Sequence, residues 1–102
     1  MSAAELEVLL LGLLRLWQVE AQVSSAPEKD RLTARIERRG EPVLAVSWQV
    51  EPFGVAWKVT QEGKRQRTYP SVIGLIRHLR HSLAPERDAA RVLFAASSAK
   101  AE

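Results

Sequence analysis

The segment RLTARIERRGEPVLAVSWQVEPFGVAWKVTQEGK, residues 31–64, decides the fold because apolar and polar side chains alternate along it with the period of a β-strand. Glycine and proline residues divide the alternation into three runs, which predict strands over residues 31–40, 41–52 and 53–64. The connections are short and contain glycine, so we expect the three strands to form an antiparallel meander.

The alternation gives the predicted sheet two unlike faces. The half-polar face carries Arg35 and Lys58 among serine, threonine and alanine residues. We expect at least one helix on the bulky face and partial exposure of the half-polar face. The bulky face collects Leu32, Ala34, Ile36, Leu44, Val46, Trp48, Val50, Val55, Trp57 and Val59.

Helical patterns flank the predicted sheet. Residues 3–23 are rich in leucine with spacings of three and four, and Ser2 with Glu5 forms a capping-box pattern at their start. Residues 24–30 are interpreted as a polar connector. A second apolar stripe predicts a helix that starts at Pro70 or Ser71 and continues to Leu83.

Pro85 ends this second helix, and residues 85–98 predict a further short one. The fold class is therefore α+β, in the order α-β-β-β-α with an additional C-terminal helix. We expect one domain over residues 1–96, which suits a chain of 102 residues, and a frayed tail over residues 97–102.

Composition narrows the function classes. The chain has no cysteine, which excludes disulfides, thiol catalysis and cysteine-based zinc sites. Its net charge is +3, a mild excess that is compatible with an anionic partner. Charged residues interrupt the apolar N-terminal run, so we expect no membrane span and a cytoplasmic or nuclear protein.

Catalytic patterns are weak. His78 and His81 lie three residues apart without an acidic neighbour in sequence, so we interpret them as solvated or half-buried helix residues. The serines and glycines match no nucleophile or phosphate-loop motif. We therefore expect no enzyme activity, no catalytic residue, no bound metal and no cofactor.

A basic cluster gives the strongest binding signal. Lys64, Arg65 and Arg67 precede the second helix, whose N-terminal N–H groups attract anions. Arg38 and Arg39 lie in the first turn of the meander. The competing interpretation is a charged loop that only contacts water. The candidate phosphate ligands are Arg35, Arg38, Arg39, Lys58, Lys64, Arg65 and Arg67.

Residues 32–83 resemble an SH2 domain. The run LTARIERRGEPVLAVSW is similar to the FLVRES strand and the strand after it, GVAWKV is similar to the next strand, and TYPSVIGLIRHLRHSL resembles the following helix. The resemblance implies that Arg35 stands at the phosphotyrosine-binding arginine, that Lys58 lies beside the pocket, and that Arg38 and Arg39 lie in the phosphate-binding loop. It implies a phosphopeptide or another protein as the partner.

The same element order also resembles the αβββα RNA-binding folds of double-stranded RNA-binding domains and of the Alu-binding subunits of the signal recognition particle. These folds place both helices on one sheet face. The resemblance implies that Lys64, Arg65 and Arg67, or the sheet face with Arg35 and Lys58, would contact RNA phosphates.

A third interpretation is an interaction scaffold. The N-terminal helix has more apolar surface than one small sheet face can bury, which favours a homo-oligomer or a hetero-complex. The candidate interface residues are Leu9, Leu13, Leu16 and Trp17. The expected function is a non-enzymatic binding module for a phosphate-bearing partner, with phosphopeptide recognition placed ahead of RNA binding and of oligomerisation.

Overall fold

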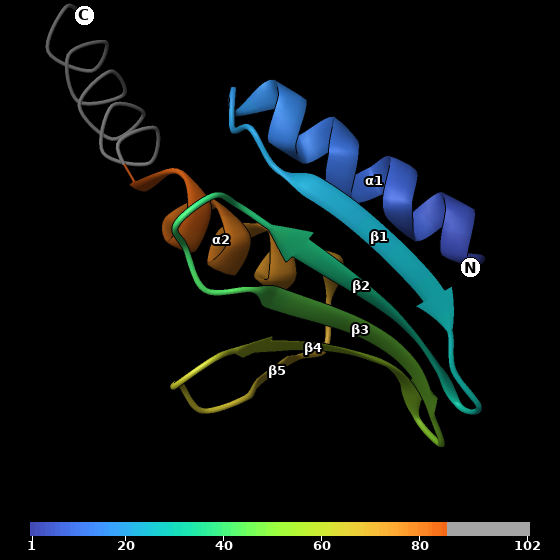
Figure 1. The fold of residues 1–102 in the computed structure, drawn as a ribbon. Coiled ribbons are helices and arrows are strands. Elements are labelled where there is room, and N and C mark those ends of the chain that lie inside the picture. Colours follow the sequence, from blue (N-terminus) through green and yellow to red (C-terminus); the bar gives the residue numbers. More distant parts are fainter. Residues whose placement is uncertain (86–102) are drawn as a thin grey trace, which may run out of the picture.

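A computed structural model describes residues 1–85 and shows two helices on one five-stranded antiparallel sheet (Figure 1). The α+β class and the meander are thereby confirmed. The strands follow one another across the sheet in chain order. The elements are α1 (Ala3–Leu16), β1 (Gln22–Pro27), β2 (Arg31–Glu37), β3 (Leu44–Glu51), β4 (Gly54–Gln61), β5 (Arg67–Tyr69) and α2 (Val72–Leu83).

The N-terminal helix is shorter than its sequence pattern predicts. Ser2 caps it by accepting a hydrogen bond from the Glu5 N–H, as the sequence indicated. The helix ends at Leu16 rather than continuing to residue 23. Gln18 has a φ of 57°, a left-handed conformation that stops a right-handed helix and turns the chain toward β1.

Two edge strands were not predicted. β1 occupies much of the segment interpreted as a polar connector, and it pairs with β2 from Gln22 opposite Glu37 to Pro27 opposite Leu32. β5 lies just before the predicted start of the second helix, in a segment for which no strand was predicted, and it pairs with residues 57–59 of β4. Neither strand is rich in large apolar residues, so their strand character comes from pairing with a neighbour rather than from burial.

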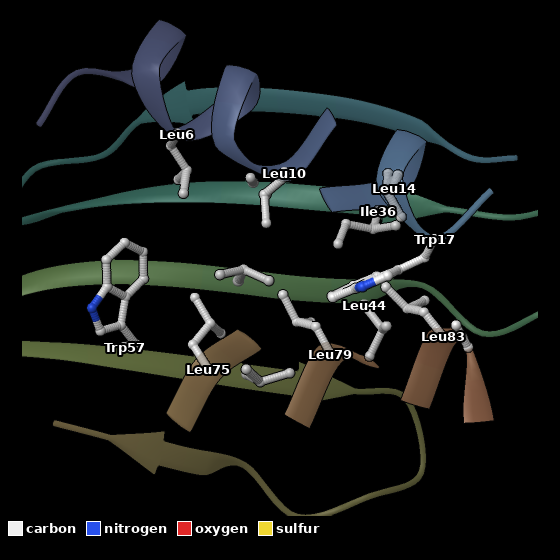
Figure 2. Close-up of a cluster of buried hydrophobic side chains, with 14 residues drawn as sticks. Leu6, Leu10, Leu14, Trp17, Ile36, Leu44, Trp57, Leu75, Leu79 and Leu83 are labelled. Atoms are coloured by element: carbon white, nitrogen blue, oxygen red, sulfur yellow. The ribbon is translucent and has the colours of Figure 1, made fainter. Parts of the chain in front are cut away.

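Both helices cover the same face of the sheet. Leu6, Leu10 and Leu14 of α1 and Leu75, Leu79 and Leu83 of α2 point toward each other above the strands (Figure 2). Between them lie the bulky side chains that sequence alternation assigned to this face, including Ile36, Leu44, Val46 and Val59, all of which are buried. The expectation of helices on the bulky face is confirmed.

The other face of the sheet carries no helix within residues 1–85. Strand alternation places Thr33, Arg35, Ser47 and Lys58 on it, opposite to the buried positions of the same strands. We call this surface the open face. Apart from Pro85, the predicted helix over residues 85–98 and the predicted tail lie outside the residues that the structure describes.

Candidate functional site

A basic groove lies between the β4–β5 turn and the last turns of α2. It has a volume of about 340 Å³, and no carboxylate side chain lines it. We call it the basic groove. Its lining residues are Val59, Gln61, Lys64, Arg65, Arg67, His78, His81 and Ser82.

The local chain path explains how these residues meet. Gly63 has a φ of 81°, and the Lys64 N–H donates to the Gln61 carbonyl oxygen, so the chain reverses tightly after β4. β5 then carries the chain away from this turn, with Arg67 opposite Val59 and Tyr69 opposite Trp57. The following helix runs back along β5, which brings its last turns beside the turn.

Close packing of Tyr69 against α2 holds this arrangement. The Tyr69 hydroxyl is hydrogen-bonded to Nδ1 of His78, and the two ring centroids lie 5.4 Å apart. Gly74 makes the approach possible, because a Cβ atom at that position would lie 3.1 Å from Cδ1 of Tyr69. His78 is therefore oriented on the wall of the basic groove by a hydrogen bond from the sheet.

Several positively charged groups surround His78 in the groove. Burial lowers the pKa of His78 below its ordinary value, and the positive charges of Arg67, His81 and Lys64 lower it further. The C-terminal end of α2 opposes this potential with roughly half a negative charge. Lys64, Arg65 and Arg67 together carry three full positive charges, so the groove favours an anion.

The position of the basic cluster corrects one expectation. Lys64, Arg65 and Arg67 were expected at the start of the second helix, where its N–H groups would help to bind an anion. Lys64 and Arg65 precede the strand β5 and Arg67 begins it, so the strand lies between the cluster and that end. Ser71, which accepts a hydrogen bond from the Gly74 N–H, caps the helix there. The groove therefore depends on side-chain charge rather than on helix N–H groups.

Arg35 and Lys58 lie on the open face, but the structure does not bring them together. Arg35 is opposite Ala45, whereas Lys58 is opposite Ser47, so the central strand β3 separates them. Nε of Arg35 lies 3.9 Å from a carboxylate oxygen of Glu37. The Lys58 ammonium donates to the Gln49 side-chain oxygen over 3.1 Å.

Arg38 and Arg39 form a separate feature in the β2–β3 turn. They line a shallow depression with Glu20 and Glu37, so positive and negative side chains are mixed there. This turn and the β4–β5 turn lie at the same end of the sheet, because Leu44 is paired with Ile36 on one side and with Gln61 on the other.

The predicted interface residues on α1 have different environments. Leu9 and Leu13 are half-buried against the core, and Leu16 is 73% exposed. Trp17 is only 7% exposed and belongs to the core, so little of its side chain is accessible to a second chain. The chain turns immediately after Trp17 and directs its indole ring inward instead of along the outer surface of the helix.

The two histidines of the groove lie on α2, where His78 is half-buried and His81 is exposed, as the sequence predicts. Their position in the basic groove was not predicted. Their spacing of three residues does place both on one side of α2. This spacing is the only feature of the sequence that groups the two histidines. It indicates a shared site only when the β4–β5 turn is known to lie against the same side of the helix.

Other kinds of site are not found in the described part of the chain. Residues 1–85 contain no group of three or more histidine, cysteine or acidic residues placed to hold a metal ion. Within the same residues, no helix has the length and apolar character needed to span a membrane. Comparison with protein-family models, curated proteins and solved structures finds no match to this chain.

Proposed function

We propose that this chain is a non-enzymatic binding module that recognises a phosphorylated segment of another protein. The phosphate occupies the basic groove, with Lys64, Arg65 and Arg67 as its ligands. The observation that carries the proposal is the gathering of these three side chains and two histidines in one groove with no carboxylate in its lining.

The chemistry of the groove suits a phosphomonoester. The planar guanidinium groups of Arg65 and Arg67 can each donate two parallel hydrogen bonds to phosphate oxygens, and Lys64 adds a point charge. Ser82 and the histidines add further hydrogen-bonding groups at the wall. A phosphate dianion gains more from several cations than a single carboxylate does, which favours phosphorylated over unmodified acidic segments.

The surroundings of the groove favour a single phosphate over a polyanion. Glu62 lies in the β4–β5 turn itself, and Glu20 and Glu37 lie beside Arg38 and Arg39 at the same end of the sheet. A nucleic acid strand laid across this end would bring further phosphates close to those carboxylates. A peptide with one phosphate avoids this repulsion, so we place phosphopeptide recognition ahead of RNA binding.

Fluorescence anisotropy with a phosphotyrosine, phosphoserine and phosphothreonine peptide library tests the proposal. We expect selected phosphopeptides to bind and their unphosphorylated forms not to bind. Arg65→Ala and Arg67→Ala should each weaken binding by about 10-fold to 100-fold, because a hydrogen bond to a charged group contributes about 1.5–3 kcal/mol. Arg35→Ala is the matched control, since Arg35 is an exposed arginine on the open face.

The outcomes separate the competing sites. Loss of phosphopeptide binding in Arg35→Ala, with Arg67→Ala unaffected, would move the site to the open face, as the SH2 resemblance implies. Binding to structured RNA that falls steeply between about 50 mM and 200 mM salt, without phosphopeptide binding, would replace the proposal with RNA recognition. Absence of binding to both probes would refute a phosphate-binding function.

A further inference from the structure

The two edges of the sheet are unequal. β5 is three residues long and begins with Arg67, so it is a short edge with a charged side chain. β1 is six residues long, and its sequence QVSSAP has no charged side chain. Proteins usually protect edge strands by shortening them or by adding charges, because unpaired backbone groups at an edge can pair with another chain. β5 has both protections and β1 has neither.

The free backbone groups of β1 can be assigned from its pairing with β2. The Glu28 N–H donates to the Arg31 carbonyl oxygen at the hairpin end, and hydrogen-bonded pairs alternate along an antiparallel ladder. The N–H and C=O groups of Val23 and Ser25 therefore point away from β2. Pro27 presents only its carbonyl oxygen in that direction.

Apolar side chains of α1 continue this edge. The Ser25 hydroxyl donates to the carboxylate of Glu7 and lies 3.0 Å from the Ala3 carbonyl oxygen, so this side of α1 lies over β1. Helical spacing places Val8 and Leu11 on the adjoining outer side, together with Ala4. Val8 is 69% exposed and Leu11 is 41% exposed. We call Ala4, Val8 and Leu11 the outer strip of α1.

The outer strip is complementary to itself under two-fold symmetry. A two-fold axis at the β1 edge, perpendicular to the sheet, would make the two α1 helices antiparallel neighbours. The spacing of the strip then places the small side chain of Ala4 opposite Leu11 of the second helix, with the two Val8 side chains at the centre. Among residues 1–85 no strand pairs with the outer edge of β1, and the adjoining helix strip is self-complementary, so both features favour a second copy of this chain as the partner.

We propose that the chain forms a two-fold symmetric homodimer in which β1 pairs antiparallel with β1 of a second copy and the outer strips of both α1 helices pack together. The sheet is then continuous through the dimer. Val23 of one copy lies opposite Ser25 of the other, because this register gives every outward group of both residues a partner. A register centred on Ser25 would instead place the Val23 carbonyl opposite Pro27, which has no N–H.

The proposed register makes a sharp geometric prediction at Ser24. The two Ser24 residues face each other as a non-hydrogen-bonded pair, for which Cα atoms lie about 4.5 Å apart. This separation lies within the range that a disulfide bridges. Because the chain has no cysteine, Ser24→Cys introduces its only thiol, and the variant should form a disulfide-linked dimer under mild oxidation.

Ala26→Cys is the matched control for cross-linking. Ala26 is exposed on the same face of the same strand, but the register places the two Ala26 residues four residues apart along the strands. We expect its cross-linked fraction to be at least about 10-fold lower than that of Ser24→Cys. Equal cross-linking of both variants, or cross-linking of neither, would overturn the proposed register and the strand pairing.

Light scattering during size-exclusion chromatography tests the dimer without modification. We expect the wild-type chain to elute with twice its mass of 11.4 kDa. The double variant Val8→Lys, Leu11→Lys should elute as a folded monomer with the wild-type circular dichroism spectrum, whereas Ile73→Lys, at an exposed apolar position of α2, should remain dimeric. A wild-type monomer at all concentrations would refute the proposal.

This inference is independent of the phosphate-binding proposal. The β1 edge and the basic groove lie at opposite edges of the sheet, because the groove is built on β4, β5 and α2. Arg67→Ala should therefore leave the dimer intact, and Ser24→Cys should leave phosphopeptide binding intact. Failure of one experiment leaves the other interpretable.

Discussion

At the scale of single residues, His78 links the packing of α2 to pH. Its imidazole ring is hydrogen-bonded to Tyr69, and the positive groups that face it are Arg67 and Lys64 from the β4–β5 region and His81 from its own helix. These charges and partial burial favour the neutral ring. A proton on His78 is therefore less stable in the folded chain than in the unfolded one.

The pH dependence of stability follows from this difference. Because the pKa of His78 in the folded chain lies below the unfolded value of 6.5, the unfolded state binds more protons as pH falls below that value. The stabilisation is complete above about pH 6.5 and is lost as pH falls through the folded pKa. We expect the urea midpoint to decrease between about pH 7 and pH 5, and the decrease to be smaller in His78→Gln. Parallel midpoint curves for the two proteins would contradict this assignment.

The candidate site shows what sequence can and cannot reveal about single residues. Lys64, Arg65 and Arg67 were predicted together because they are neighbours in the chain, and they do line one groove. Arg35, Lys58 and Arg38 were grouped with them, but pairing across β3 and the path of the turns keep them apart. His78 is half-buried on a helix, as predicted, but its place in the groove was not predicted because the side of α2 that contacts β5 depends on tertiary packing.

At the scale of elements, α2 has two sides with very different energetic roles. Leu79 is 1% exposed and packs among core residues, whereas Ile73 in the first turn is 61% exposed. We expect Leu79→Ala to reduce the free energy of unfolding by about 2–5 kcal/mol, because it removes buried methyl groups and leaves a cavity. Urea titration followed by tryptophan fluorescence measures this change.

Ile73→Ala is the control for that experiment. The same helix loses an aliphatic side chain of the same volume, but at a position in contact with water. We expect a change within about 0.5 kcal/mol. A similar loss of stability in both variants would show that side-chain volume or helix propensity, rather than burial, controls the stability of α2.

Elements with a strong internal pattern could be predicted, and elements defined by their neighbours could not. The 3.6-residue stripe of α2 and the alternation of β2, β3 and β4 reflect burial on one face, which sequence records directly. β1 and β5 are edge strands with mostly exposed side chains, so the hydropathy pattern of the sequence does not predict their pairing. The end of α1 depends on the left-handed backbone conformation of Gln18. Glycine or asparagine at this position would have indicated a helix end, whereas glutamine does not.

At the scale of the whole molecule, the two proposals describe one arrangement. In the proposed dimer the β1 edges are joined, and the basic grooves would lie at the far edges of the continuous sheet. Two grooves on one rigid body would bind two phosphorylated segments, and a partner that carries both gains avidity without any new contact. Neither proposal uses the open face.

The order of the strands also has a kinetic consequence. Each strand pairs with its neighbour in the chain, so no long loop must close before the sheet can form. We expect the main refolding phase of the monomer to be a single exponential in the range of about milliseconds, as for α/β chains with many short-range contacts. Stopped-flow fluorescence can follow it, because Trp17 and Trp57 move from water into the core. A nascent chain of this topology can add one strand at a time to a growing sheet, and each new strand covers the exposed edge of the strand before it, whereas the outer edge of β1 is not covered by any later strand of residues 1–85.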